Sequence, residues 1–457
     1  MIVSVNPSTT HTLATFEPDD AAHVDRALEA AVSAQRAWRT RPIGERAELL
    51  RRTAAGLRDK CEQYAQLITL EMGKPIVESR AEIEKCAKTL DFYAENATGF
   101  LESQPVPSNA SESSVVFEPL GLVLAIMPWN YPFWQYFRFA APALAAGNAP
   151  VLKHANNVPQ CARAVEEVLR EAGAPDGLCP TLLVESDRVS GLITDDRIAA
   201  VTLTGSTEVG RIVAGRAGRA LKKQVLELGG SDPFIVLADA DIDEAARTAV
   251  KARFTNGGQS CVNAKRFIVE DAVADRFVDA FVENVSRLRV GDPRDEHTDI
   301  GPMARENLRD ELHAQVQRTL ENGRSVLKAG GAPVDGPGYF YQPTVIDHVE
   351  PGDVAFTEET FGPVAAIVRA RDPEHAIDLA NDTEFGLGAA LWTRDLDRAR
   401  SLASRIEAGA VFINGMVASD PRLPFGGIKA SGYGRELGEF GLREFVNVKT
   451  VWIGPAA

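Results

Sequence analysis

The chain has 457 residues, 45% hydrophobic and 25% charged, a composition typical of a globular protein long enough for two substantial domains. Its formal net charge of -15 argues against nucleic acid as a partner, because phosphate binding draws on clustered Lys and Arg. The five cysteines are scattered, odd in number and without a C-x-x-C pair, so they form a poor disulfide framework and favour a reducing, cytoplasmic location.

The sequence gives no positive signal for a metal, for secretion or for a membrane. The seven histidines form no short-range ligand pair, so we expect no metal site. The first residues lack the basic region and apolar run of a signal peptide. No uninterrupted apolar segment approaches the ~20 residues that span a bilayer, and we expect no membrane partner.

Three amphipathic helices are predicted toward the N-terminus. Asp19 or Asp20 can cap the first helix, in which apolar residues recur at helical spacing. The second is expected from residue 45 to about 70, with an interruption near Cys61, and the third from residue 76 to about 100.

Strands and helices alternate in the rest of the chain, which predicts βαβ units and a largely parallel sheet. Residues 229–232 are the predicted junction between two domains. Strands are expected at residues 113–118, 121–127, 149–153, 179–184, 199–204, 223–227, 234–237, 266–269, 365–368 and 410–413. Helices are expected near residues 133–146, 159–172, 186–194 and 207–217.

Cys261 is the candidate nucleophile. It follows Asn256, Gly257, Gly258 and Gln259 in a turn where the backbone can bend tightly and a substrate can approach without meeting side chains. Taken alone, Cys261 is better explained as a buried cysteine that acts as a small apolar side chain.

Two residues at predicted strand ends could assist such a nucleophile. Asn130 has an amide donor that could stabilise an oxyanion, a role worth ~3 kcal/mol, or it could simply stabilise the turn before Pro132. Glu227 precedes Gly229 and Gly230, where partial dehydration would raise its pKa and suit it to act as a base. A surface glutamate is the alternative.

No G-x-G-x-x-G motif follows a predicted strand. A cofactor site is therefore indicated only by residues that lie at the ends of predicted strands. Residues 199–204 lead through Gly205 and Ser206 into a helix, whose free N–H groups could bind a phosphate. Lys153 ends the predicted strand at residues 149–153, at the edge where ligands bind open α/β sheets. A capped strand-to-helix turn and a solvated lysine are the alternatives.

Taken in order, these motifs resemble the aldehyde dehydrogenase superfamily over nearly the whole chain, and most of all its short bacterial succinate semialdehyde dehydrogenases. The motifs are Pro128-Trp129-Asn130, Lys153, Gly205-Ser206, Glu227-Leu-Gly-Gly230, Cys261, Glu359-Thr-Phe361-Gly-Pro363 and Pro424-Phe-Gly-Gly-Ile-Lys429. Together they outweigh the structural alternatives for each residue.

The resemblance implies an α/β fold with a Rossmann-type cofactor domain, an α/β catalytic domain and a small β-ribbon oligomerisation element. In this sequence the cofactor domain would comprise residues 1–102 and 119–228, and the catalytic domain residues 229–430. The β-ribbon would comprise residues 103–118 and 441–457, and would join subunits into a homodimer or homotetramer.

The resemblance also implies a mechanism. Cys261 would attack the aldehyde carbonyl, while the Asn130 side chain and the Cys261 backbone N–H hold the oxyanion. After hydride transfer to a nicotinamide, Glu227 would activate water to hydrolyse the thioester, giving a carboxylate.

For the cofactor, the family pattern implies a contact surface that includes Trp129, Lys153, Asn156, Gly205, Ser206, Glu359 and Phe361. Glu359 would hold the nicotinamide ribose and Phe361 would pack near the nicotinamide ring. Family members that prefer NAD often carry Glu three residues after the lysine, where it would repel a 2'-phosphate. Asn156 stands there in this chain, so we expect a preference for NADP, with NAD accepted.

For the substrate, Arg138 lies eight residues after Asn130, where similar succinate semialdehyde dehydrogenases carry Arg and where it could pair with an anionic tail. Trp134, four residues before it on the same helix face, would line the tunnel. Ser419 resembles a second carboxylate ligand, with Asp420 as the alternative.

Two departures from the family pattern bear on the substrate and on regulation. Thr255 stands where many such enzymes carry a second Arg, which would leave Arg138 as the single carboxylate ligand. Asn263 stands where some carry a redox-switching Cys. The alternatives are a dehydrogenase for another small or medium aldehyde, and a thioesterase-type or noncatalytic protein on the same scaffold.

Overall fold

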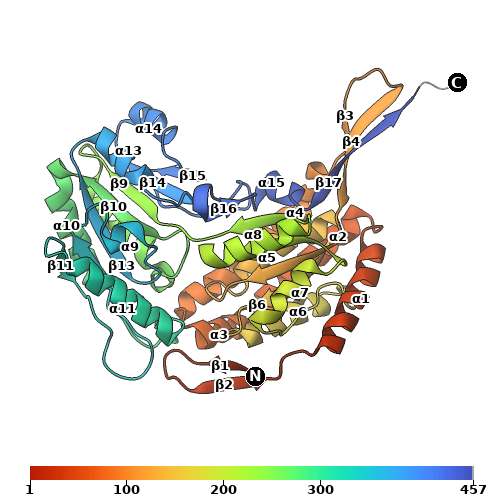
Figure 1. Cartoon of the computed structure of the whole chain (residues 1–457), viewed down its shortest axis with the longest axis horizontal. Coiled ribbons are helices and arrows are strands. Elements are labelled where there is room, and N and C mark those ends of the chain that lie inside the picture. The colour runs from red at the N-terminus through yellow and green to blue at the C-terminus, as the bar shows by residue number, and fades with distance from the viewer. Residues whose placement is uncertain (455–457) are drawn as a thin grey trace.

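Two α/β lobes and a projecting β-ribbon make up the chain in a computed structural model that describes residues 1–454 (Figure 1). The last three residues of the expected element 441–457 lie outside the described residues. The first lobe is drawn mainly in red to green and the second mainly in green to blue, while the ribbon extends away from both.

The N-terminal part of the chain folds as predicted into helices, after a short antiparallel strand pair. The side chain of Asp20 caps the first helix by accepting a hydrogen bond from the backbone N–H of His23. The expected interruption falls at Lys60, and Gly73, with a positive φ of 85°, ends the third helix. The elements are β1 (Ile2–Val5), β2 (Thr12–Phe16), α1 (Ala21–Trp38), α2 (Ile43–Asp59), α3 (Cys61–Met72) and α4 (Ile76–Phe100).

A five-stranded sheet in the order β16-β8-β7-β5-β6 forms the centre of the first lobe. Its strands are parallel except β16, which confirms the predicted parallel sheet. The carboxyl ends of β5, β6 and β7 therefore meet at one edge. The elements are β5 (Leu122–Met127), α5 (Trp134–Ala146), β6 (Ala149–His154), α6 (Pro159–Glu171), η1 (Ser186–Arg188), α7 (Val189–Thr194), β7 (Ile198–Thr204), α8 (Thr207–Arg219), β8 (Lys223–Glu227) and β16 (Gly432–Tyr433).

The prediction of a strand at residues 179–184 is wrong. Only Thr181 pairs with Leu152 of β6, through bonds from Leu152 N–H to Pro180 O and from Leu182 N–H to Leu152 O. Pro180 has no N–H to donate to a ladder, so the apolar segment is buried beside β6 without extending the sheet.

A seven-stranded sheet in the order β11-β12-β13-β10-β9-β14-β15 forms the second lobe, and only β11 runs antiparallel to its neighbour. The four strands predicted for this region are all present. The elements are β9 (Asp232–Val236), α9 (Ile242–Phe254), η2 (Thr255–Gly258), β10 (Ala264–Glu270), α10 (Asp271–Val285), α11 (Glu306–Leu320), β11 (Val326–Ala329), β12 (Thr344–Asp347), α12 (Val354–Thr357), β13 (Val364–Ala370), α13 (Pro373–Asn381), β14 (Gly388–Trp392), α14 (Leu396–Ala403), β15 (Ala410–Ile413) and η3 (Lys429–Ser431).

The projecting ribbon is a three-stranded antiparallel sheet in the order β17-β4-β3, which joins residues far apart in the sequence. It comprises β3 (Gln104–Pro105), β4 (Glu112–Pro119) and β17 (Val446–Ile453), and α15 (Gly438–Arg443) precedes it. Most side chains of β17 are exposed.

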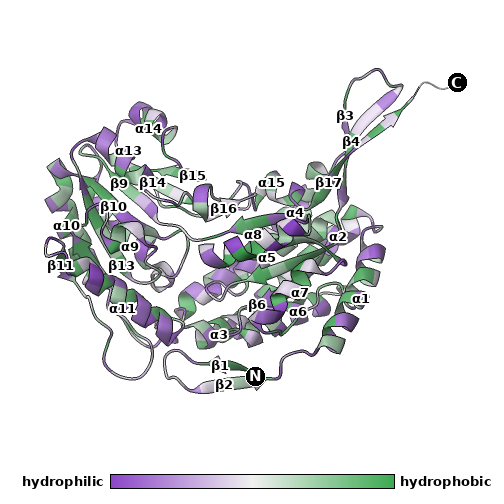
Figure 2. Ribbon diagram, viewed as in Figure 1, coloured by the Kyte–Doolittle hydropathy of each residue, from purple (hydrophilic) through white to green (hydrophobic). Residues whose placement is uncertain are grey.

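The core of each lobe is built from apolar strands covered by amphipathic helices, as Figure 2 shows in green for the strands and in mixed colours for the outer helices. Along residues 1–454, we find no helix that is long and apolar enough to cross a membrane.

A buried ion pair links the helical layer to the start of α5. Lys74 pairs with Glu82 of α4, and both side chains are almost completely buried. Glu82 Oε1 also accepts hydrogen bonds from the N–H groups of Phe133 (2.9 Å) and Trp134 (3.0 Å). Because the first N–H groups of a helix have no partner within it, Glu82 fixes where α5 begins.

We predict that Glu82→Leu lowers the free energy of unfolding by about 3–5 kcal/mol, because it leaves Lys74 buried without its partner and two N–H groups without an acceptor. Thermal unfolding followed by circular dichroism measures the shift. Glu84→Gln is the matched control, since Glu84 is exposed on the same helix and surface pairs contribute little. Equal midpoints for the two variants would contradict the structural role of Glu82.

Candidate active site

The turn that carries Cys261 has a left-handed backbone. Asn256, Gly257 and Gly258 have φ values of 56°, 59° and 72°. A Cβ at Gly258 would lie 2.3 Å from the carbonyl oxygen of Gly362, so this position requires glycine. Cys261 itself is only 9% exposed.

The backbone N–H and the side-chain Nδ2 of Asn256 both donate hydrogen bonds that hold the turn. Its N–H donates to Glu78 Oε2 of α4 at 2.7 Å. Its Nδ2 donates to the carbonyl oxygens of Asn130 (2.9 Å) and Gln259 (3.2 Å). These contacts fix the nucleophile turn of the second lobe against two segments of the first.

Asn130 lies directly beside the same turn. Its Nδ2 donates to Gln259 O at 3.1 Å, and its side chain is buried. A primary amide carries two hydrogens, so one hydrogen bond to Gln259 leaves a second donor for an oxyanion near Cys261.

Glu227 ends β8 and is 1% exposed. Neither of its carboxylate oxygens accepts a hydrogen bond from any group within residues 1–454. Burial raises the pKa of Glu227 well above its usual range, neighbouring Glu436 adds to the shift, and Arg138 opposes it. The predicted rise in pKa is thus confirmed, and Glu227 is suited to accept a proton.

The Cys261 thiol is held in its protonated form at neutral pH in this structure. Burial raises its pKa to about 11, while Arg138 and Lys265 favour the thiolate and Glu227 disfavours it. Formation of the nucleophile therefore requires a base or an added positive charge.

Lys265, which was not among the predicted site residues, lies against the turn that carries Cys261. It is completely buried, and its Nζ donates to the carbonyl oxygens of Ser260 (3.0 Å) and Cys261 (2.7 Å). It also lies 3.2 Å from Glu359 Oε1. The available signal was a pair of cations, Lys265 and Arg266, in a strand whose other residues before Glu270 are apolar.

The expected cofactor residues gather at the carboxyl edge of the first sheet. Lys153, at the end of β6, donates to Asn156 Oδ1 at 3.0 Å, and burial lowers the pKa of Lys153 to about 8. Lys153 forms no ion pair with the described residues 1–454. Gly205 and Ser206 connect β7 to α8, where Ser206 is the cap. A buried lysine with spare donors beside a helix start fits an anionic ribose-phosphate group.

Glu359 and the expected nicotinamide residues lie near Cys261. Glu359 Oε1 accepts from the N–H of Gly230 at 3.0 Å. A Cβ at Gly229 would lie 2.5 Å from Glu359 Oε2, so glycine makes room for the carboxylate. The rings of Trp129 and Phe361 meet edge to face at 5.8 Å.

A cavity of about 160 Å³ opens at Cys261. The expected substrate residues all line it, together with a lysine that the sequence did not single out. These residues are Trp134, Arg138, Ser419 and Lys85. Asp420 is absent from the described lining, and its carboxylate instead accepts two hydrogen bonds from the Arg422 guanidinium and one from the Arg422 N–H. Ser419 is therefore the better placed of the two alternatives.

Arg138 lies in the cavity wall, as expected, but its guanidinium already has an acidic partner within the protein. Its Nε pairs with Glu436, both side chains are at most 3% exposed, and its guanidinium lies 4.7 Å from the Phe425 ring centroid. Its charge is therefore already matched within the protein.

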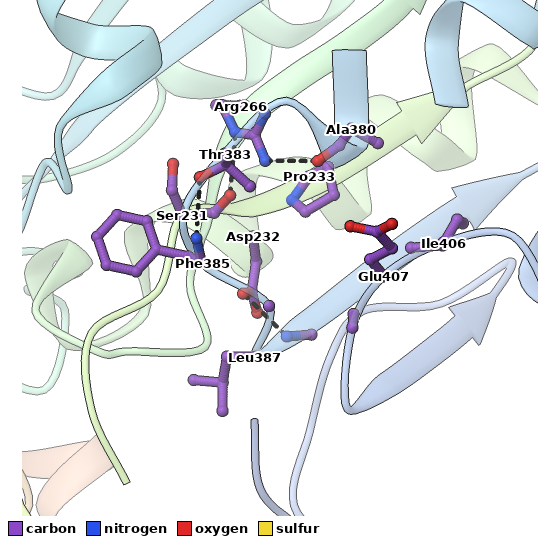
Figure 3. Close-up of a pocket in the computed structure, with 13 residues that line it drawn as sticks. Ser231, Asp232, Pro233, Arg266, Ala380, Thr383, Phe385, Leu387, Ile406 and Glu407 are labelled. Carbon is purple, nitrogen blue, oxygen red and sulfur yellow. Dashed lines mark hydrogen bonds between the residues drawn. The ribbon is translucent and has the colours of Figure 1, made fainter. Parts of the chain in front are cut away.

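A second pocket, shown in Figure 3, lies in the second lobe beside Asp232 and Arg266. Arg266 donates to Ala380 O at 2.9 Å, and burial raises the pKa of Asp232 to about 7. The volume of about 10 Å³ suits a single water molecule and excludes a substrate. Within residues 1–454, no group of three or more His, Cys, Asp and Glu assembles as metal ligands.

Comparison with known proteins agrees with this geometry. The profile of the aldehyde dehydrogenase family matches residues 1–451. Succinate semialdehyde dehydrogenase [NAD(P)+] Sad of Escherichia coli (strain K12) is 50% identical over 450 residues, covering 98% of this chain and 97% of that protein. The NADP(+) succinate-semialdehyde dehydrogenase of Mycobacterium avium (strain 104) is 49% identical, covering 99% of this chain and 97% of that protein.

Solved structures show the same fold. Succinic semialdehyde dehydrogenase from Streptococcus pyogenes, in complex with NADP+, superposes with a TM-score of 0.97 at 37% identity, and the match covers 100% of both chains. The protein Gox0499 superposes with a TM-score of 0.97 at 42% identity, covering 99% of this chain and 100% of that one. The expected fold class is confirmed. The chain belongs to the aldehyde dehydrogenase family.

Proposed function

We propose that this enzyme oxidises succinate semialdehyde to succinate, with NADP as the preferred hydride acceptor and NAD accepted. The observation that carries the proposal is a small cavity in which Cys261 and cationic side chains share one wall. Support comes from relatives at about half identity that are named as NADP(+) or NAD(P)+ succinate semialdehyde dehydrogenases.

In the first step, Cys261 Sγ bonds to the aldehyde carbon and loses its proton. Arg138 and Lys265 favour the thiolate, so the proton leaves to solvent, and Glu227 stays free to act on water in the third step. The carbonyl oxygen gains negative charge and accepts hydrogen bonds from the free Asn130 amide hydrogen and the Cys261 N–H.

In the second step, the carbon attached to Cys261 is oxidised to a thioester. The bound nicotinamide supplies the acceptor for the hydride. Glu359 and Lys153 would hold the two riboses of that cofactor, a role supported by the carboxylate near Cys261 and the buried ammonium at the end of β6.

In the third step, Glu227 takes a proton from water, whose oxygen bonds to the thioester carbon. The bond from that carbon to Cys261 Sγ then breaks, and the thiolate leaves as the carboxylate forms. The two unpaired oxygens of Glu227 are free to bind this water.

We also infer the division of labour between the lobes. Residues 1–102 and 119–228 bind the cofactor, and residues 229–430 carry the nucleophile. Residues 103–118 and 441–457 join subunits of a cytoplasmic homodimer or homotetramer. Exposed apolar side chains on β17 support this role, because such patches often mark interaction surfaces. They are Val448, Val451, Trp452 and Ile453.

A second candidate is oxidation of another small or medium aldehyde. The pairing of Arg138 with Glu436 favours it, because a matched arginine offers less attraction to a substrate carboxylate.

We predict that a panel of aldehydes assayed with both cofactors gives the highest kcat/KM for succinate semialdehyde with NADP. Cys261→Ala abolishes NADPH formation because the nucleophile is lost. Cys61→Ser is the matched control, since this free cysteine is partly exposed and lies on α3, outside the cavity lining. A higher kcat/KM for an uncharged aldehyde would instead support the second candidate.

We predict that Glu227→Gln retains a burst of about one NADPH per active site but lowers steady-state turnover roughly 10²- to 10⁴-fold, because the thioester forms and water is not activated. Stopped-flow absorbance at 340 nm, the ordinary NADPH band, separates the two phases. Since burial raises the pKa of Glu227, its base form is populated as pH rises, so wild-type deacylation accelerates with pH. The same pH dependence in Glu227→Gln would rule out Glu227 as the base.

We predict that Asn156→Glu lowers kcat/KM for NADP roughly 100-fold while NAD remains a substrate, because a carboxylate repels the 2'-phosphate. The lysine contact made by Asn156 Oδ1 is available to Glu as well. Asn156→Gln serves as the uncharged control and keeps the NADP preference. Similar ratios of NADP to NAD efficiency in all three proteins would show that this position does not select the cofactor.

A further inference from the structure

A single buried ammonium holds the backbone on both sides of the nucleophile. Lys265 is the second residue of β10, and its side chain is completely buried. Its Nζ donates to Ser260 O at 3.0 Å, and this oxygen belongs to the peptide unit before the Cys261 Cα. It also donates to Cys261 O at 2.7 Å, and this oxygen belongs to the peptide unit after that Cα. Because each peptide unit is planar, the two hydrogen bonds together restrain both backbone dihedrals of Cys261.

The N–H of Cys261 belongs to the same peptide unit as the Ser260 carbonyl. In a trans peptide the C=O and the N–H point in opposite directions, so a donor that holds Ser260 O directs the Cys261 N–H away from Lys265. This N–H donates to no group within residues 1–454. It is therefore open to an acceptor that a substrate supplies.

The charge of Lys265 has a partner, which explains how an ammonium can be buried behind the nucleophile. Glu359 Oε1 lies 3.2 Å from Lys265 Nζ and also accepts from the N–H of Gly230 at 3.0 Å. The three hydrogens of the ammonium thus match one carboxylate oxygen and two carbonyl oxygens. Charge-assisted hydrogen bonds are stronger than neutral ones, so Lys265 can hold the turn firmly.

The two carbonyl groups depend on Lys265 to different degrees. Ser260 O also accepts from the N–H of Asn263 at 3.2 Å. Within the described residues 1–454, no other group donates to Cys261 O. A Cβ at Gly230 would lie 3.0 Å from Cys261 O, so this carbonyl is closely packed as well. Loss of the ammonium would leave Cys261 O buried without a donor.

We propose that Lys265 is a positioning residue for the attack of Cys261 on the aldehyde, because it directs the Cys261 N–H toward the carbonyl oxygen of the substrate. When Sγ bonds to the carbonyl carbon, the electron pair of the carbonyl π bond moves to the oxygen, and the N–H donates to this oxyanion. The thiol proton leaves to solvent. The proposal deepens the proposed function and rests on it, since it requires that Cys261 attacks an aldehyde.

Alkylation of Cys261 by iodoacetamide separates this role from an effect on the thiol. In alkylation Sγ displaces iodide and no oxyanion forms, whereas attack on an aldehyde forms one. Lys265 also favours the thiolate, so Lys265→Met slows both reactions. We expect the single-turnover rate constant for NADPH formation from succinate semialdehyde to fall roughly 10-fold more than the rate constant for alkylation, since misdirection loses part of the contribution of one oxyanion donor. Mass spectrometry of the peptide that carries Cys261 measures alkylation.

A second measurement omits the cofactor. Succinate semialdehyde that is bonded to Cys261 Sγ protects this thiol from iodoacetamide, and the half-protecting concentration reports the stability of the adduct. Lys265→Met raises this concentration roughly 10-fold, because the adduct loses the hydrogen bond from the Cys261 N–H. Succinate forms no adduct with the thiol, and its half-protecting concentration changes by less than about 2-fold.

Lys251→Met is the matched control, because Lys251 is exposed on α9 of the same lobe. It leaves both rate constants and both half-protecting concentrations unchanged. Thermal unfolding of each variant identifies a general loss of structure. If Lys265→Met does not fold, Lys265→Gln replaces it, since the amide keeps N–H donors without the charge and the selective losses keep the same direction.

Equal losses in NADPH formation and in alkylation would overturn the proposal, because the effect of Lys265 would then lie in the thiol alone. A selective loss in NADPH formation with unchanged protection by the aldehyde would also overturn it, since the effect would then require the cofactor. If the wild-type enzyme forms no NADPH from succinate semialdehyde, the proposed function fails. Protection by the aldehyde with the highest kcat/KM of the panel then decides on Lys265 separately.

Discussion

One face of α4 holds the segments around the active site together through three charged side chains, of which Glu82 is buried and Glu78 and Lys85 are half-buried. Glu78, Glu82 and Lys85 follow one another at helical spacing, so their side chains leave the helix on the same side. Glu78 binds the nucleophile turn through Asn256, Glu82 fixes the start of α5, and Lys85 contacts Ser419. Since a charge withdrawn from water needs at least a polar group to bind, these contacts specify how the segments around α4 are arranged.

The same constraint explains how a thiol and a carboxylate are kept ready for reaction. Glu227, Glu436 and Arg138 share a region from which water is largely excluded, and the single arginine cannot neutralise both carboxylates. The pKa values of both glutamates are therefore raised. Cys261 lies in the same field, where burial favours the thiol and the nearby cations favour the thiolate, so small changes in local charge can shift its reactivity.

Much of the fold was predictable because hydrophobic periodicity and turn residues act locally. The break near Cys61, the cap at Asp20 and the alternating strands and helices all follow from neighbouring residues. The strand expected at residues 179–184 failed because pairing depends on a neighbour distant in sequence, and Pro180 lacks a donor. Likewise, the pairing of β4 with β17 joins residues that no local pattern connects.

By itself, the sequence determined the family and predicted the nucleophile and the residues at the carboxyl ends of the strands, because these depend on short motifs with fixed spacing. Only the tertiary structure decided the state of each charge. It paired Arg138 with Glu436, placed Lys265 behind Cys261, and left Lys85 facing the cavity without a carboxylate partner among the described residues. The physical reason is that burial and electrostatic pairing depend on distances in space, and these distances join α4, α5, β10 and the segments near Ser419 and Glu436 only after the chain has folded.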